Sequence, residues 1–149
     1  MTADLVRAEG RTFRPRKAVD AVLIDAPCSA TGTLRRRPDV LHHRAVADLA
    51  GLAAIQRKLL ARAASWLSQG GRLIYATCSL QHEEGEAVVA DVTGAMKGKL
   101  AIDPVSTAEA GSFAPALTGD GCLRILPSDF TDIGGVDGFF IARLQSVPP

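Results

Sequence analysis

The sequence predicts an α/β fold, because two apolar strand-like runs stand on either side of an amphipathic helical segment and each run ends in a loop. Residues 19–25 (VDAVLID) are a short, nearly continuous apolar run, which is typical of a parallel strand covered on both faces. Residues 72–77 (RLIYAT) form the second run. Strand, loop, helix and strand in this order indicate two parallel strands, and we expect residues 19–25 to be a central one.

The helix between these strands is expected over residues 46–69, where apolar side chains recur at helical spacing with polar ones between them. Gly70 and Gly71 follow this segment and are expected to form its C-cap. A second helix is expected over residues 83–96, because acidic residues in its first turn would complement the helix dipole.

The rest of the chain has weaker signals. Residues 106–121 are rich in Ala, Gly, Ser and Thr and are expected to form a loop. Residues 4–8 are expected to form one more short strand, with Glu9 at its carboxyl end. Three further strands are expected at residues 100–105, 122–126 and 138–144.

Length and composition indicate a single globular domain over residues 1–149, since 47% of the 149 residues are hydrophobic and 22% are charged. No segment approaches the roughly 20 apolar residues of a membrane helix, and the start lacks an apolar signal-peptide stretch, so we expect a cytoplasmic protein. The three cysteines are too few for a disulfide framework and lack metal-ligand spacing. We therefore expect thiols rather than disulfides, and no metal site.

Charge is unevenly distributed along the chain. Residues 1–45 contain nine Lys/Arg and five Asp/Glu, a net of +4, whereas residues 46–149 contain eight and eleven, a net of −3. This split suits contact with a polyanion on one side, and a solvated charged surface explains it equally well. Arg35, Arg36 and Arg37 follow the first strand's loop closely, where guanidinium groups would hold phosphates or would simply be solvated.

Two cysteines stand at equivalent places in the predicted sheet. Cys28 and Cys78 each lie in a short loop after a strand, at the carboxyl edge where open α/β sheets bind ligands. A thiolate there is a nucleophile, and Asp25 places a carboxylate in the same crevice. The alternatives are that each cysteine is a small buried hydrophobe, as we expect for Cys122, and that Asp25 is a turn or helix cap.

Other cysteine chemistries fit less well. A cysteine protease needs a histidine partner, and the candidates are His42, His43 and His82. His82 lies only four residues after Cys78, where a solvated loop position is expected. The absence of a CxxC motif argues against a thiol–disulfide oxidoreductase, although Cys28 and Cys78 could still form a redox pair.

Several long motifs resemble one known family. The segment D-A-P-C-S-A-T-G at 25–32, followed by R-R-R-P-D at 35–39, and the segment Y-A-T-C-S-L at 75–80 resemble the RNA 5-methylcytosine methyltransferases of the Sun family. The ending G-x-D-G-F-F-x-A-R-L at 135–144 is similar to that family's last strand. The resemblance covers nearly the whole chain and is strongest to the bacterial enzymes that act on small-subunit ribosomal RNA, though transfer-RNA enzymes share these motifs.

The resemblance implies a fold and roles for particular residues. The fold is a Rossmann-like S-adenosylmethionine-dependent methyltransferase fold, a three-layer α/β/α arrangement truncated at its N-terminal strands, with an antiparallel strand at 138–144. Cys78 corresponds to the nucleophile that adds to carbon 6 of cytosine, and Cys28 to the second cysteine, which assists product release. Asp25 corresponds to the carboxylate where cofactor and base meet.

The substrate implied by the resemblance is RNA, with ribosomal RNA favoured over transfer RNA, and its target base is unstacked to reach the cysteine. The resemblance also implies that Arg35, Arg36 and Arg37 position the RNA backbone. The family's glycine-rich cofactor loop is absent, and Glu9 falls where the family has an acid near the adenosine, so an incomplete S-adenosylmethionine site with Glu9 and Asp25 is expected.

The sequence is therefore consistent with two functions. The first is an RNA cytosine-5 methyltransferase, and the second is an inactive remnant that binds RNA or a protein partner. Missing strands would leave an unpaired sheet edge and exposed apolar surface, so self-association is also expected.

Overall fold

A computed structural model describes residues 5–10, 12–43 and 48–148 of the chain. The predicted α/β fold is confirmed, and helices and strands alternate through most of the chain. The elements are β1 (Val19–Asp25), α1 (Val40–His43), α2 (Leu49–Ala64), β2 (Leu67–Thr77), α3 (Glu86–Ala95), β3 (Leu100–Ile102), α4 (Thr107–Ala110), β4 (Leu123–Ile125) and β5 (Phe139–Ser146).

The five strands form one mixed sheet in the order β1-β2-β5-β3, with β4 also paired to β5. β1 and β2 are parallel, as predicted, and Asp25 at the end of β1 lies opposite Ala76 near the end of β2. β5 runs antiparallel to β2, which confirms the orientation expected for the last strand. Because β1 and β2 are parallel neighbours, the loops that follow them leave the same edge of the sheet.

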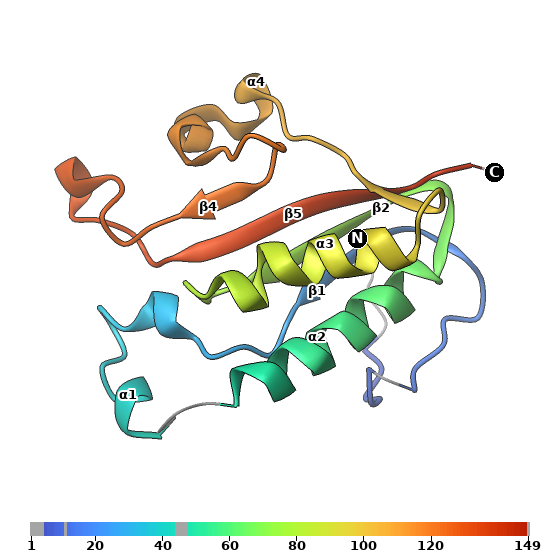
Figure 1. Cartoon of the computed structure of the whole chain (residues 1–149), viewed down its shortest axis with the longest axis horizontal. Helices are drawn as coiled ribbons and strands as arrows, with labels where there is room; N and C mark the ends of the chain where they lie inside the picture. The colour runs from blue at the N-terminus through green and yellow to red at the C-terminus, as the bar shows by residue number, and fades with distance from the viewer. Residues whose placement is uncertain (1–4, 11, 44–47, 149) are drawn as a thin grey trace.

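Helices α2 and α3 lie side by side across one face of the sheet (Figure 1). This face holds the core, and Tyr75 of β2 and Phe140 of β5 are completely buried on it with their rings 6.5 Å apart. Such large apolar side chains contribute most of the hydrophobic stabilisation of a small domain. The helices contribute further buried apolar side chains, among them Ala53, Leu60, Val88, Val89 and Val92.

The opposite face of the sheet is more open. Leu23 of β1 is 72% exposed, and its neighbour Ile74 on β2 is only half-buried. α2 and α3 both pack on the other face, so the described residues provide the sheet and one helical layer of the three-layer arrangement. Among the described residues, β1 is paired on one side only, so its prediction as a central strand is wrong within this part of the structure.

The helix predicted to reach residue 69 ends earlier. α2 stops at Ala64 with Ser65 as its C-cap, whereas Gly70 and Gly71 lie inside β2. The amide of Val19 donates to the carbonyl of Trp66 at 2.9 Å, so pairing with β1 draws the chain into the sheet before the glycines are reached. Tertiary pairing thus overrides the local glycine signal.

Residues 46 and 47, predicted as the start of the same helix, lie outside the described residues. The described helix begins at Leu49 and is capped by Asp48, whose carboxylate accepts the amide of Gly51 at 2.8 Å. An acidic N-cap satisfies one of the amides that a helix start leaves unpaired.

The second predicted helix begins later than expected. Residues His82–Glu84 form a 3-10 turn, and α3 starts at Glu86. Gly85 separates them with φ −113° and ψ −99°, which is incompatible with continuous α-helix. This break turns Glu84 into the protein interior, where it is fully buried.

The region predicted as a loop over residues 106–121 contains α4 and a 3-10 turn at Gly111–Ala116. Ser106 and Glu109 form a capping box, in which each side chain satisfies the other's backbone amide. The S-x-x-E spacing is a sequence signal for this helix start. β3 and β4 are present but end sooner than predicted, at Ile102 and Ile125.

No strand forms over residues 5–8, and residue 4 lies outside the described residues. Leu5 is fully exposed, and within the described chain nothing pairs with the free edge of β1. The carbonyl of Glu9 accepts the amides of Thr12 and Phe13, so Glu9 opens a turn rather than ending a strand. The predicted strand at 4–8 is therefore wrong over its described part.

Among the described residues, no helix has the length and apolar character needed to cross a membrane. The cytoplasmic location stays a prediction.

Candidate active site

The two loop cysteines meet, as the parallel strands predicted. Cys28 lies three residues after β1 and Cys78 directly after β2, and their Sγ atoms are 3.4 Å apart. Cys28 is only 5% exposed, whereas Cys78 is half-buried. The more accessible sulfur of the pair is therefore that of Cys78.

The environments of the two thiols differ. Burial raises the pKa of Cys28 to about 12, and the hydrogen bond with Cys78 adds to this shift. Near neutral pH, Cys28 therefore keeps its proton and can donate a hydrogen bond to the sulfur of Cys78. The pair combines an accessible thiol with a buried hydrogen-bond donor beside it.

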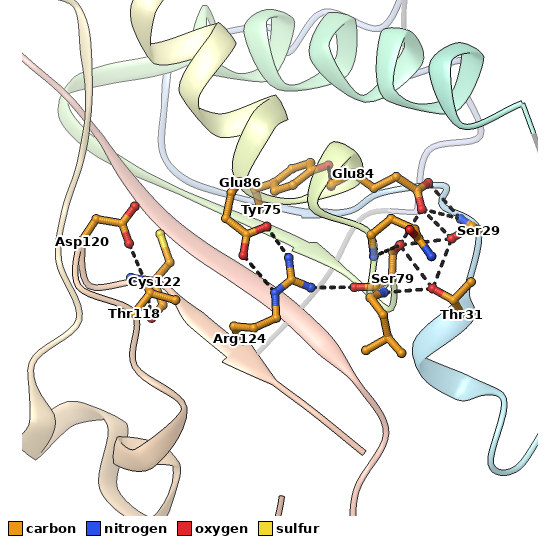
Figure 2. Close-up of polar contacts among 12 residues, drawn as sticks. Ser29, Thr31, Tyr75, Ser79, Glu84, Glu86, Thr118, Asp120, Cys122 and Arg124 are labelled. Carbon is orange, nitrogen blue, oxygen red and sulfur yellow. Dashed lines mark hydrogen bonds and ion pairs between the residues drawn. The ribbon is translucent and has the colours of Figure 1, made fainter. Parts of the chain in front are cut away.

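A buried carboxylate joins the two cysteine loops, and sequence reasoning missed it. Glu84 accepts the amide of Ser29 at 2.9 Å and hydrogen bonds from the hydroxyls of Ser29 and Ser79 (Figure 2). These serines directly follow Cys28 and Cys78. A signal was present in the sequence: each cysteine is followed by a serine, and an acidic segment comes directly after the second loop.

Further contacts tie the same loops together. Gln56 of α2 donates to the carbonyl of Pro27 at 2.8 Å and to Glu84 at 3.0 Å. The amide of Gly32 donates to the carbonyl of Cys78 at 2.9 Å. The amide of Leu80 donates to the Thr31 hydroxyl, also at 2.9 Å. The two loops thus behave as one packed unit.

Arg124 of β4 also contacts the loop that follows β2 and carries Cys78. It donates to the carbonyl of Ser79 at 2.8 Å and forms an ion pair with Glu86 (Figure 2). Its guanidinium carbon lies 4.8 Å from the centre of the Phe140 ring, a cation–π contact. This arginine was not singled out from the sequence.

Asp25 ends β1 and is exposed. Its side chain has no hydrogen bond or ion pair with any described residue, which argues against the alternative that it caps a turn or helix. An exposed carboxylate at the ligand-binding edge of a parallel sheet is available to a substrate or cofactor.

The three arginines are exposed at the rim that follows the first cysteine loop. Arg36 forms a two-pronged ion pair with Asp137, and Arg37 pairs with Asp39. Arg35 donates to the carbonyl of Gly134 at 2.7 Å. Their side chains are therefore held against the 134–137 segment or against a neighbouring acid.

The remaining candidates take no part in this cluster. Cys122 is 1% exposed, as expected for a structural residue, and burial raises its pKa to about 12. His82 is exposed and makes no hydrogen bond to Cys78 among the described residues. The side chains of His42 and His43 lie outside the described part of the structure. A cysteine–histidine catalytic pair thus has no support among the described side chains.

Fold and site together define a class of protein, an α/β protein with two cysteines in the loops at the carboxyl ends of adjacent parallel strands. The family described as 16S rRNA methyltransferase RsmB/F matches residues 1–145. The chain belongs to this family of RNA 5-methylcytosine methyltransferases.

Sequence comparison finds similar proteins in several bacteria. The chain is 33% identical over 150 residues to the Ribosomal RNA small subunit methyltransferase F of Serratia proteamaculans, with 97% of this chain and 30% of that protein covered. It is 36% identical over 146 residues to the protein of the same name from Erwinia tasmaniensis, covering 95% and 30%. The chain thus spans about 30% of the length of the curated relatives that it matches.

Comparison with solved structures also finds methyltransferases. The crystal structure of NSun6 from Pyrococcus horikoshii with SFG matches with a TM-score of 0.73 and 27% identity, covering 98% of this chain and 35% of that one. A methyltransferase homologue from Pyrococcus horikoshii matches with a TM-score of 0.61 and 28% identity, covering 88% and 40%. The predicted methyltransferase fold is confirmed over this portion of those structures.

Proposed function

We propose that this chain carries the base-activating part of an RNA cytosine-5 methyltransferase, with ribosomal RNA as the favoured substrate. The observation that carries the proposal is the 3.4 Å contact between the thiols of Cys28 and Cys78 in the loops after two parallel strands. The names of the relatives support an RNA substrate.

Cys78 is the nucleophile in this proposal. Its thiolate adds to carbon 6 of cytosine, which forms a carbon–sulfur bond and makes carbon 5 nucleophilic. Once carbon 5 has gained the methyl group, a solvent water accepts the proton of carbon 5. The electrons of that bond re-form the double bond between carbons 5 and 6, the carbon–sulfur bond breaks, and Cys78 leaves as a thiolate. Asp25 hydrogen-bonds the ring nitrogen or amino group of the base and stabilises the developing charge.

Cys28 assists the last of these steps. Burial holds its pKa at about 12, so Cys28 is a protonated thiol at neutral pH. It can donate a hydrogen bond to the sulfur of Cys78 as that sulfur regains its negative charge, because the two Sγ atoms are in hydrogen-bond contact. This favours release of the methylated base.

S-adenosylmethionine supplies the methyl group in this family when bound. The described residues fit only part of a site for it: Asp25 is exposed and without a partner, but Glu9 opens a turn and β1 has no described strand on its free side. We therefore expect the cofactor site to be incomplete within this chain and to need a second copy or further residues.

The RNA-facing part of the proposal rests on Arg35, Arg36 and Arg37. They are exposed and follow the Cys28 loop, so they can contact phosphates that flank a base held near the cysteines. A base must leave its stack to reach these thiols, which favours single-stranded or looped RNA.

The first experiment is a calorimetric titration of the 149-residue chain with S-adenosylmethionine. Saturable binding would show that the chain, alone or as an oligomer, completes the cofactor site. Absence of binding is the expected result and would restrict the chain to base activation.

The second experiment detects a covalent RNA adduct on denaturing gels. In a complete enzyme with a functional S-adenosylmethionine site, we expect Cys28→Ala to accumulate an adduct with a cytosine-containing loop RNA, because release of the methylated base is slowed. Cys78→Ala should form none, and Cys122→Ala should match the unmodified chain. Adduct formation by Cys78→Ala, or none by any form of the protein, would contradict the proposed chemistry.

A second candidate function is RNA binding without catalysis. A hollow of about 390 Å³ near the start of β1 is lined by Arg14, Arg16, Lys17 and Arg62, together with Trp66. Within the described residues Arg14, Arg16 and Lys17 have no acidic partner, so this surface can attract a polyanion. RNA affinity unchanged by Cys78→Ala, with no adduct, would favour this function.

A further inference from the structure

Glu84 is a fully buried acid to which the chemistry above gives no role. No Lys or Arg of the described chain forms an ion pair with it. Four donor groups surround it instead: the amide and hydroxyl of Ser29, the hydroxyl of Ser79, and the amide group of Gln56. Burying a carboxylate is costly unless such donors replace the lost water.

The donors come from both cysteine loops. Ser29 directly follows Cys28 and Ser79 directly follows Cys78, and both serines are almost completely buried. Gln56 donates to Glu84 and also to the carbonyl of Pro27, the residue before Cys28. The carboxylate of Glu84 thus fixes the residue that directly follows each cysteine.

We propose that Glu84 is a positioning residue that sets the contact between the thiols of Cys28 and Cys78. The proposal deepens the proposed function and rests on it for the roles of these cysteines. Its physical basis is that a carboxylate only accepts hydrogen bonds, so its two oxygens can hold donors from two separate loops at once. Hydrogen bonds to a charged acceptor are also stronger than those between neutral groups.

Glutamine at this position would break the arrangement while keeping its shape. Glu84→Gln replaces one acceptor oxygen with an amino group that donates, and this group would face the donors of Ser29, Ser79 or Gln56. At least one loop then loses its attachment. The two sulfurs should spend less time in contact as a result.

The equilibrium between the dithiol and a Cys28–Cys78 disulfide measures this contact without any methyl transfer. In a glutathione buffer, the two thiols give up two protons and two electrons, one sulfur–sulfur bond forms, and glutathione disulfide is reduced to two thiols. The more often the two sulfurs meet, the more the disulfide is favoured. Cys122→Ala serves as the background for all variants, because it removes the third thiol.

We expect Glu84→Gln to weaken formation of this disulfide at least about tenfold, equivalent to about 30 mV in reduction potential. Ser29→Ala and Ser79→Ala each remove one hydroxyl donor and should shift the equilibrium in the same direction by less. These milder variants test the proposal if Glu84→Gln does not fold.

Leu144→Ala is the matched control for a merely structural effect. Leu144 is fully buried in β5 and lies opposite Leu73, away from the end of β2 that carries Cys78. It should lower the melting temperature and leave the disulfide equilibrium unchanged. If Glu84→Gln also leaves the equilibrium unchanged, or Leu144→Ala shifts it equally, Glu84 is not a positioning residue.

The outcome can be separated from that of the proposed function. A dependence on Glu84, with no RNA adduct formed by any variant, would support the positioning role and contradict the cytosine chemistry. An RNA adduct that forms while Glu84→Gln leaves the disulfide equilibrium unchanged would support the cytosine chemistry and contradict the positioning role.

Discussion

The amide of Gly138 donates a hydrogen bond to the carbonyl of Gly32 at 2.8 Å, with no space for a side chain between them. Gly32 lies in the turn after Cys28, and Gly138 directly precedes β5. Since the amide of Gly32 also donates to Cys78, this turn joins three distant segments of the chain. A close backbone approach of this kind requires glycine.

Gly32→Ala is expected to destabilise the protein by about 1–3 kcal/mol, because overpacking forces the backbone to move. A Cβ at Gly32 would lie 2.1 Å from the carbonyl oxygen of Gly138. Thermal unfolding followed by circular dichroism measures the change.

The control for this prediction is Gly94→Ala. Gly94 lies in α3, and a Cβ there would have nothing within 4 Å. Alanine should stabilise the helix by up to about 1 kcal/mol. Equal changes in thermal stability for the two substitutions would show that the close Gly32–Gly138 contact does not contribute to stability.

Alkylation by iodoacetamide should distinguish the cysteines by pH. Burial raises the pKa of both Cys28 and Cys122 to about 12, so few of their thiols are ionised at pH 8. Cys78, which is more exposed, should be labelled first, and labelling of the other two should rise toward pH 12. Peptide mass mapping measures each site, and equal labelling of Cys78 and Cys122 at pH 8 would refute the prediction.

Stability should fall in alkaline solution. The pKa of Cys122 is about 12 in the folded protein against an ordinary value of 9.0, so the folded state holds this proton where the unfolded state loses it. The corresponding stabilisation is complete below pH 9 and is lost as pH rises toward 12. The difference in unfolding free energy between the unmodified chain and Cys122→Ala isolates this effect, and a difference independent of pH between 8 and 11 would contradict it.

Self-association through β1 is a further prediction. Leu23 is 72% exposed on a strand that lacks a partner on one side among the described residues. Leu23→Glu should reduce any concentration-dependent association seen by light scattering. Leu41→Glu is the control, because Leu41 is similarly exposed at 63% but lies in α1. Association abolished equally by both substitutions would place the contact elsewhere.

Arg36→Ala should weaken RNA binding. Loss of one phosphate contact lowers the slope of log affinity against log salt by about 0.7 for single-stranded RNA. Filter binding at several salt concentrations measures the slope. Arg57→Ala, which removes an exposed arginine paired with Asp91 on the helical face, should leave it unchanged. A slope unaffected by Arg36→Ala would remove Arg36 from the RNA interface.

Local patterns were sufficient to predict much of this protein. The apolar run of β1 gave its bounds correctly, and the strand–loop–helix–strand order placed Cys28 and Cys78 at one edge. The motifs around these cysteines indicated the family, which the comparisons confirm. The roles of Cys28, Cys78 and Asp25 stay predictions.

The errors arose where neighbours in space decided the outcome. Glycines at 70–71 signalled a helix end, but pairing with β1 began the strand before them. The run at 19–25 was apolar enough for a central strand, yet within the described part of the chain it lies at an edge of the sheet with Leu23 exposed. The hydrophobicity of a segment indicates a preference for burial, but it does not determine which other strand or helix will cover that segment.

The sequence by itself determined the class of fold, the family and the meeting of two cysteines, because each depends on short-range order along the chain. Only the tertiary structure revealed that the carboxylate of Glu84 accepts hydrogen bonds from Ser29 and Ser79, the residues that follow the two cysteines. That contact links residues 55 positions apart, and it arises because a buried carboxylate must find donors wherever folding brings them.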